Sequence, residues 1–205
     1  PKLAVIPAGT TNDFARALKI PRDNLVDAAK VILTGKTQKM DIGRAGKHYF
    51  MNIAASGSLT ELTYGVPSEV KSVLGYSAYL LKGAEMLPKI SSNKMRLTYD
   101  DGVYEGNLSM FLLGMTNSIG GFERIMPDAQ LSDGLFQLIV VKTANPVDVL
   151  RLMAMALNGN HVNDPQIIYT KTEYLKVELL DNSKDKEPIP VNLDGEIGGH
   201  LPIDF

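Results

Sequence analysis

The chain has 205 residues, of which 44% are hydrophobic and 21% are charged, a composition typical of a globular protein with a sizeable core. Its formal net charge of −2 argues against a nucleic-acid-binding protein that works by bulk positive charge. The absence of cysteine excludes thiolate chemistry, and the scattered histidines argue against a histidine zinc site. No apolar run approaches the roughly 20 residues of a membrane-spanning helix, so we expect any membrane contact to be peripheral.

The first 36 residues follow an α/β pattern. The apolar run at residues 3–6 predicts a short buried strand. A turn at residues 7–9 leads into a helix that starts at residues 11–13, where Thr, Asn and Asp can satisfy free backbone N–H groups. A second helix is predicted over residues 25–33, closed by Gly35 in the left-handed conformation. Because a core strand is predicted directly after Pro1, we expect the sequence to begin in mid-domain.

The rest of the chain is rich in predicted strands. Asp100-Asp101-Gly102 predicts a hairpin turn after the alternating segment at residues 95–99. The apolar runs at residues 109–115 and 135–141 are typical of central strands. This order predicts a β-rich domain with helical insertions. Its remaining strands are expected at residues 40–42, 49–53, 103–107, 174–180 and 189–193, and its helices at residues 68–87 and 146–157.

The segment from Pro7 to Arg16 carries the strongest functional signal. A strand, a glycine turn and a helix start expose backbone N–H groups that can bind phosphate. Thr10 adds a hydroxyl, and Asp13 could contact a metal ion or pair with Arg16. The same pattern is also typical of a capped helix after a tight turn, so these residues alone leave both interpretations open.

Three further carboxylates are candidate site residues. Asp133 lies in a loop where a carboxylate beside backbone carbonyls could hold Mg²⁺. Glu196 follows Asp194-Gly195 after an apolar strand, where it could take the proton from a hydroxyl. Asp41 lies in an apolar segment and needs a partner, either Arg16 or water. Asp-Gly pairs are also common in turns, so a purely structural interpretation stays open for both loops.

Together and in this order, these segments resemble the diacylglycerol kinase and related lipid kinase family, above all its soluble bacterial members. Residues 7–16 match the family pattern Pro-x-Gly-Thr-x-Asn-Asp-Phe-Ala-Arg throughout. The resemblance implies an α+β fold, with a remnant of an α/β nucleotide-binding domain at residues 1–36. A β-rich, β-sandwich-like C-terminal lipid kinase domain with helical insertions would follow at residues 37–205. The likeness continues through residues 40–43, 111–117, 131–134 and 194–196.

The resemblance also implies a reaction, the transfer of phosphate from ATP to diacylglycerol to give phosphatidic acid. Glu196 would be the proton acceptor. Mg²⁺ would be bound by the side chain of Asp133 and the backbone carbonyls of Gln130 and Leu135. This assignment requires Asp13, Asp133 and Glu196 to meet in one cleft. Thr10 would lie near the ATP phosphates, and a polar network between the site and Mg²⁺ would contain Asp13, Arg16 and Asp41.

The family's main nucleotide loop, Gly-Gly-Asp-Gly-Thr, is not found in these residues, so we expect the 205-residue fragment to be inactive alone. The alternatives are another lipid or sphingoid acceptor, a soluble acceptor as in the NAD kinases, and a non-catalytic lipid-binding domain. The implied partners are a lipid substrate and a membrane surface, with no nucleic acid. The expected location is the cytoplasm, peripherally at the inner face of the membrane, and a homodimer is among the assemblies left open.

The predicted helix at residues 68–87 is the candidate membrane contact. Lys71 and Lys82 are eleven residues apart, which at about 3.6 residues per turn places them on nearly one face. Lysines on such a face can bind anionic lipid. The alternative is a helix that packs its apolar side on the sheet and leaves its lysines in water.

Overall fold

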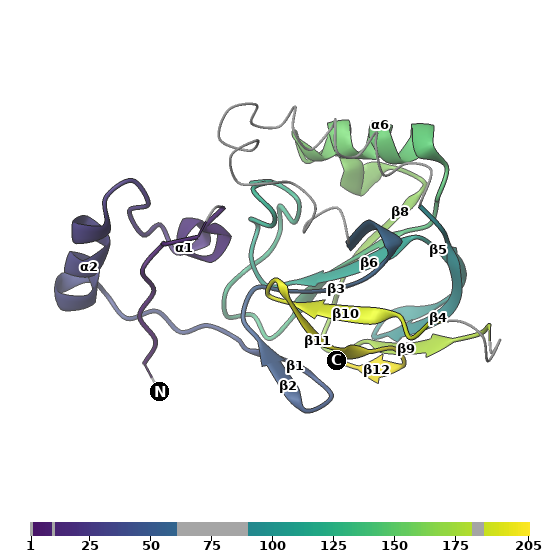
Figure 1. The fold of residues 1–205 in the computed structure, drawn as a ribbon, viewed down its shortest axis with the longest axis horizontal. Helices are drawn as coiled ribbons and strands as arrows, with labels where there is room; N and C mark the ends of the chain where they lie inside the picture. Colours follow the sequence, from purple (N-terminus) through teal and green to yellow (C-terminus); the bar gives the residue numbers. More distant parts are fainter. Residues whose placement is uncertain (1, 10, 61–89, 182–186) are drawn as a thin grey trace.

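The structure is a computed structural model that describes residues 2–9, 11–60, 90–181 and 187–205. A small N-terminal segment with helices α1 (Asp13–Ala17) and α2 (Leu25–Thr34) lies beside a larger β-rich body (Figure 1). An exposed stretch without regular secondary structure connects α2 to the first hairpin, β1 (Gly43–Ala45) and β2 (His48–Phe50).

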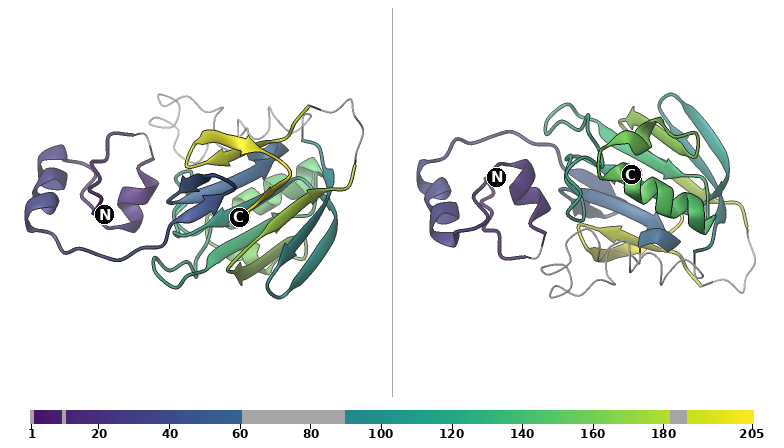
Figure 2. Two further views of the ribbon diagram at one scale, coloured as in Figure 1. Left: turned by 90° about the horizontal axis from the view of Figure 1, so that it is seen from below. Right: turned by 90° about the horizontal axis from the view of Figure 1, so that it is seen from above.

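Two antiparallel sheets form the body. The six-stranded sheet has the order β11-β10-β3-β6-β7-β8, and the four-stranded sheet has the order β12-β9-β4-β5. The sheets face each other as a sandwich, seen from two sides in Figure 2. The bounds are β3 (Ile53–Gly57), β4 (Asn93–Tyr99), β5 (Gly102–Leu108), β6 (Met110–Gly114), β7 (Phe136–Val141), β8 (Ile167–Thr172), β9 (Lys176–Leu179), β10 (Pro190–Leu193), β11 (Glu196–His200) and β12 (Ile203–Asp204).

The central strands β3, β6 and β7 of the six-stranded sheet are buried on both faces. On β7, Leu138 and Val140 point into the core between the sheets, whereas Ile139 and Val141 point to a second core on the other side. Helix α6 (Pro146–Ala156) covers that second core with Val149 and Leu152 (Figure 1). Two buried faces explain why β7 reads as a continuous apolar run rather than an alternating one.

An aromatic cluster anchors the start of this body. Phe50 stacks on Phe136 with ring centroids 5.7 Å apart, and Phe205 packs edge-on against Phe50 and against Phe111. Gly43 lies opposite Phe50 in the β1–β2 hairpin, where a Cβ would approach the Phe50 ring to 2.3 Å. The ring therefore fixes the backbone that leads directly into β3.

The predicted fold class is confirmed, because the chain is α+β with a β-sandwich-like body and a helical insertion. The predicted hairpin pairs β4 with β5 from Asn93↔Leu108 to Tyr99↔Gly102. The predicted helix at residues 146–157 is α6, where Asn145 Oδ1 accepts hydrogen bonds from the backbone N–H groups of Val147 and Asp148. The predicted helix at residues 68–87, with Lys71 and Lys82, lies outside the described residues.

Several predicted elements are wrong. Residues 3–6 are extended but form no strand with the described part of the chain, and Leu3 and Ile6 are 63% and 49% exposed. An apolar run becomes a strand only where a neighbouring strand accepts its hydrogen bonds. Residues 40–42 are likewise not a strand, and the segment at 49–53 divides into β2 and β3. Gly35 ends α2 in an extended conformation with φ −73°, not the left-handed one.

We predict that Gly57→Ala destabilises the protein by about 3 kcal/mol or more, because it combines backbone strain with a steric collision. At Gly57, φ is +116° and a Cβ would lie 2.3 Å from the carbonyl oxygen of Ser109. Gly46→Ala is the matched control, since φ is +55° but the nearest atom, on Ile203, is 3.6 Å away. Its cost should be about 1–2 kcal/mol. Urea unfolding measures both, and equal costs would contradict the role of the collision.

Candidate functional site

A cavity of about 590 Å³ lies between the N-terminal segment and one end of the six-stranded sheet. Most of its polar groups come from three parts of the chain. These are the turn that precedes α1, the entry into β3, and the turn between β10 and β11. The polar residues and glycines of the lining are Gly9, Thr11, Asn12, Asp13, Asn52, Thr60, Gly120, Asn192, Asp194 and Gly195.

The turn before α1 is closed by its own side chain. Asn12 has left-handed backbone angles, φ 50° and ψ 40°, and its Oδ1 accepts a hydrogen bond of 2.8 Å from the backbone N–H of Gly9. Asn is one of the few residues that adopt this conformation readily. The predicted capping role of the polar residues at 11–13 is therefore replaced by an Asn12 bond to Gly9, because no side chain caps α1. Thr10 lies outside the described residues.

Asp13 ties α1 to the loop after β6. Its Oδ1 accepts hydrogen bonds from Ser118 Oγ at 2.7 Å and from the backbone N–H of Gly121 at 2.9 Å. Gly120 and Gly121 both have positive φ, 60° and 88°, which turns the Gly121 N–H toward the carboxylate. Asp13 Oδ2 has no hydrogen-bond partner among the described residues, so this oxygen is available to a ligand.

Arg16 points to the same loop but not to the expected partners. Its Nη1 donates to Glu123 Oε1 at 2.7 Å and to the carbonyl oxygen of Gly121 at 3.2 Å. The expected pairing with Asp13 or with Asp41 is therefore wrong. Asp13 is instead saturated on one oxygen by uncharged donors from the loop.

Asn52 and Asp194 complete the polar wall, and neither was among the site residues predicted from the sequence. Asn52 Oδ1 accepts a hydrogen bond from Thr116 Oγ1, and Asn52 Nδ2 donates to the carbonyl oxygen of Ser118 at 3.4 Å. Asp194 accepts from three successive backbone N–H groups, those of Met51, Asn52 and Ile53, at 2.6, 2.8 and 2.9 Å. The sequence signals for Asp194 were the Asp194-Gly195 pair, which is common in turns, and the presence of Glu196 two residues further on.

Asp133 and Asp41 form a second cluster at the same end of the sheet. Asp133 Oδ1 accepts from the backbone N–H of Leu135 at 3.2 Å, and its Oδ2 lies 3.3 Å from the Lys171 ammonium. Asp41 accepts from the N–H of Gly134 at 2.8 Å, which is the partner that the sequence could not identify. Neither carboxylate lines the 590 Å³ cavity within the described residues.

Strand β8 holds this loop from the other side. Lys171 and Tyr169 are two residues apart on β8, and the Tyr169 hydroxyl accepts a hydrogen bond of 3.2 Å from the backbone N–H of Asp128. Burial raises the pKa of Tyr169 to about 12, so its hydroxyl stays neutral at physiological pH. The loop from Asp128 to Asp133 is therefore fixed at both ends.

Glu196 begins β11 and is exposed. It follows Gly195, which lines the cavity, but Glu196 itself does not. Its carboxylate has no hydrogen bond or ion pair within the part of the chain that the structure describes. Of the three acids expected to meet in one cleft, only Asp13 thus lines the cavity, with Glu196 beside its rim and Asp133 in the neighbouring cluster.

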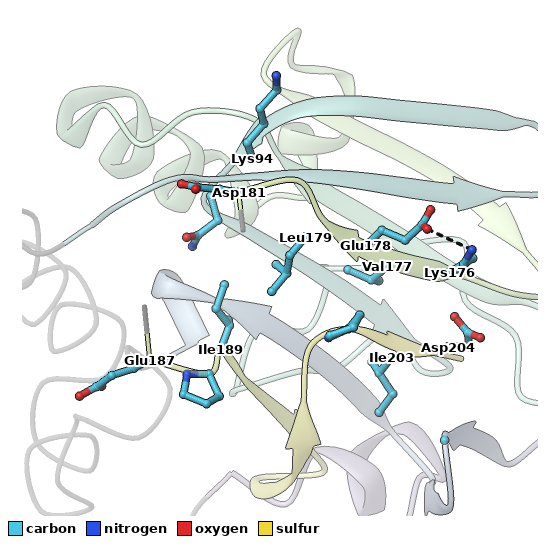
Figure 3. A pocket seen from close by; sticks show the side chains of 14 residues that line it. Lys94, Lys176, Val177, Glu178, Leu179, Asp181, Glu187, Ile189, Ile203 and Asp204 are labelled. Carbon is cyan, nitrogen blue, oxygen red and sulfur yellow. Dashed lines mark ion pairs between the residues drawn. The ribbon is translucent and has the colours of Figure 1, made fainter. Parts of the chain in front are cut away.

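A larger cavity, about 820 Å³, opens at the edge of the sandwich (Figure 3). Val177, Leu179, Ile189 and Ile203 give it apolar walls, and charged side chains surround them, including the ion pair between Lys176 and Glu178 at 3.1 Å. No predicted site residue lines it among those described. Size alone is a weaker guide than converging polar groups, so the smaller cavity is the candidate site.

Within the described ranges, no helix is both long and apolar enough to span a membrane.

Known proteins resemble this chain along its whole length. Residues 65–205 match the family described as the YegS C-terminal NAD kinase beta sandwich-like domain. The chain belongs to this family. Residues 1–45 match the diacylglycerol kinase catalytic domain. The resemblance to diacylglycerol kinases that residues 7–16 indicated is confirmed.

Named relatives agree with this family. A diacylglycerol kinase of Bacillus subtilis (strain 168) is 48% identical over 205 residues, which are 100% of this chain and 66% of that protein. A diacylglycerol kinase of Staphylococcus epidermidis (strain ATCC 12228 / FDA PCI 1200) is 44% identical over the whole chain, which covers 63% of it. The chain thus spans just under two thirds of the length of these relatives.

A solved structure has the same fold. The putative diacylglycerol kinase from Bacillus anthracis str. Sterne superposes with a TM-score of 0.76 at 27% identity, over 100% of this chain and 65% of that one. The YegS-family sandwich is therefore the architecture that presents the candidate site.

We predict that Asp13→Ala destabilises the protein by about 2 kcal/mol, because it leaves the Ser118 hydroxyl and the Gly121 N–H without their charged acceptor. Glu123→Ala is the control. It breaks the neighbouring ion pair to Arg16, but the Glu123 side chain is 61% exposed, so the change should stay within about 0.5 kcal/mol. Urea unfolding compares the two, and a larger loss for Glu123→Ala would contradict the anchoring role of Asp13.

Proposed function

We propose that the protein containing this chain is an ATP-dependent diacylglycerol kinase that phosphorylates the free hydroxyl of diacylglycerol to give phosphatidic acid. The observation that carries the proposal is that Asn12, Asp13, Asn52 and Asp194, which come from three distant parts of the chain, line one cavity. The names of the relatives and the match of residues 1–45 to a kinase catalytic domain support it.

The turn at residues 9–13 is the proposed contact for the ATP phosphates. Gly9 has no side chain and its backbone is exposed at the cavity, so phosphate oxygens can approach the turn closely. Thr10 would add a hydroxyl donor. Asp13 and Arg16 hold this turn against the loop after β6, and such fixed positioning is the main protein contribution to phosphoryl transfer.

Glu196 is the proposed general base. The hydroxyl oxygen of the lipid attacks the γ-phosphorus of ATP, and the bond from that phosphorus to the bridging oxygen of ADP breaks. The hydroxyl proton passes to the Glu196 carboxylate. A free carboxylate beside the cavity suits this step, because a general base needs an unoccupied oxygen within reach of the substrate.

Mg²⁺ is the proposed metal, with the side chain of Asp133 and the carbonyls of Gln130 and Leu135 as ligands. The described residues contain no cluster of three or more acidic or histidine side chains, so the site would depend on backbone oxygens and water. Such a set fits Mg²⁺, which prefers oxygen ligands and keeps several waters. The Lys171 ammonium at 3.3 Å indicates that this carboxylate attracts a cation. When bound, the metal would supply positive charge at the end of the sheet where the cavity lies, and Asp41 would hold the loop through Gly134.

The domain boundary is proposed at residues 36 and 37. Residues 35–39 are exposed and have no regular secondary structure, which is typical of a linker. The N-terminal part would then belong to the nucleotide-binding domain and residues 37–205 to the lipid kinase domain.

The proposed location follows from the substrate. Diacylglycerol resides in membranes, so the enzyme would work peripherally at the inner, cytoplasmic face. The acceptor proposed here is diacylglycerol, and a sphingoid or other lipid is the competing one. A homodimer stays a prediction.

We predict that Glu196→Gln lowers turnover by about 100-fold to 10,000-fold, the range that general-base catalysis contributes. The assay is radiolabel transfer from ATP to diacylglycerol, run on the gene-length protein with a sphingoid base as a parallel acceptor. Glu105→Gln is the control, because Glu105 is an exposed carboxylate paired with Arg96 on the four-stranded sheet. Near-normal turnover by Glu196→Gln would contradict the proposed base, and preferential labelling of the sphingoid base would identify a different acceptor.

Magnesium binding gives a separate prediction. If Asp133 is a ligand, Mg²⁺ at 100 times its Kd stabilises the folded protein by about 2.7 kcal/mol, and Asp133→Ala abolishes this gain. Lys171→Met removes the competing ammonium and should increase the Mg²⁺-dependent rise in Tm at subsaturating metal. Thermal unfolding with and without MgCl2 measures both effects. An unchanged response of Asp133→Ala would show that the metal binds elsewhere.

A further inference from the structure

We propose that Asp194 is a positioning residue, which fixes the turn between β10 and β11 and thereby the place of the Glu196 carboxylate. The inference rests on the proposed function, because it needs Glu196 to be the base. It adds a second residue to the reaction, one whose side chain acts through the backbone of the turn.

Asp194 is hydrogen-bonded through its side chain and its backbone to the residues that lead into β3, and we call this set of hydrogen bonds the Asp194 clamp. Its Oδ2 accepts from the N–H of Met51 at 2.6 Å, and its Oδ1 accepts from the N–H groups of Asn52 at 2.8 Å and Ile53 at 2.9 Å. The backbone N–H of Asp194 also donates to the carbonyl oxygen of Ile53 at 2.9 Å. Four hydrogen bonds therefore hold one turn residue on the entry into β3.

The clamp is built on rigid backbone. Phe50, which is 1% exposed, immediately precedes the three donors and is fixed by its stacking on Phe136. The donors themselves run into β3, a strand paired on both sides by β10 and β6. The Asp194 carboxylate thus joins the turn to a strand whose backbone is hydrogen-bonded on both sides.

The turn itself is short and specific. Asp194 and Gly195 are its two central residues, with φ 52° and 105°, and Leu193 pairs with Glu196 across it. Asn192 Oδ1 accepts a hydrogen bond of 3.0 Å from the N–H of Gly195. Positive φ at both central residues is the geometry for which Asp-Gly is favoured in tight hairpins. Glu196 therefore leaves the turn in a direction set by the two preceding residues.

Strand β11 needs this additional support. It lies at the edge of the six-stranded sheet, so only β10 pairs with it in the described part of the protein. The β10–β11 register also shifts between Val191 and Asn192. A carboxylate at the start of such a strand would otherwise depend on one neighbour with an irregular ladder. The Asp194 clamp ties the same turn to β3 directly.

The same contacts separate the roles of the two acids. Both oxygens of Asp194 are occupied by backbone donors, so Asp194 has little capacity left to accept a substrate proton. Glu196 has no such partner among the described residues. The acid that is held therefore orients the acid that is free, and displacement of a reacting group by about 1 Å can cost roughly 100-fold in rate.

The test is a double-mutant cycle in the gene-length protein with Asp194→Asn and Glu196→Gln. Asn tolerates left-handed backbone as Asp does, so the substitution keeps the turn while placing an NH2 group against an N–H donor. We expect Asp194→Asn to lower kcat for lipid phosphorylation by about 100-fold with unchanged KM for ATP. In the Glu196→Gln background the same change should have almost no further effect, because it acts through Glu196.

The outcomes are distinct. Near-normal activity of Glu196→Gln would remove the base on which the inference rests, whereas a complete lack of lipid phosphorylation by the unsubstituted gene-length protein would remove the proposed function itself. Collapse of Glu196→Gln combined with a normal Asp194→Asn would overturn only the positioning role. An equal loss from Asp194→Asn in both backgrounds would also overturn it, since a general loss of folded protein lowers activity by the same factor in each. Asp194→Gly is a second variant, which removes the side-chain hydrogen bonds without straining the turn backbone. The folding of Asp194→Asn and Asp194→Gly is checked by thermal unfolding. If both of these variants fail to fold, the clamp is structural and the inference is wrong.

Discussion

The antiparallel register of the six-stranded sheet is the constraint from which the site follows. Leu193 lies opposite Ala54, Ile53 opposite Gly114, and Gly114 opposite Gln137. The connections after β10, before β3, after β6 and before β7 must therefore emerge at one end of the sheet. Asp194, Asn52, Ser118 and Asp133 belong to these connections. A one-residue slip of a strand would turn its side chains to the opposite face, so the packing of particular side chains into each of the two cores fixes the register of β3, β6 and β7.

The acids at this end differ by what they contact rather than by residue type. Asp13 is held by a hydroxyl and an N–H through one oxygen, and Asp194 accepts hydrogen bonds from three N–H groups through both of its oxygens. Asp133 faces a lysine, and Glu196 faces no protein partner in the described chain. Similar carboxylates can thus anchor a helix, clamp a turn, attract a cation or accept a proton. The environment of each group decides which of these it can do.

Local signals in the sequence were sufficient for elements that their own residues determine. The Asp101-Gly102 turn predicted the β4–β5 hairpin, and Pro146 as a first-turn residue predicted the start of α6. Partner-dependent features could not be found in this way. Residues 3–6 are apolar but have no strand beside them, and β8 was missed because its second half is polar where it meets the loop from Asp128 to Asp133. The Asp194 clamp joins residues 141 to 143 positions apart, and no local pattern reports such a contact.

That separation along the chain has a consequence for folding. Contacts between distant residues form late, because closing a long loop costs entropy before the contact stabilises anything. The clamp requires the C-terminal hairpin of β10 and β11 to join a strand that was synthesised more than 130 residues earlier. A nascent chain can therefore complete much of the four-stranded sheet and the β3–β6–β7 core while its site is still open. The cavity gains its Asp194 wall only when β10 and β11 have joined β3, so a chain made only as far as β9 carries the turn before α1 without that wall.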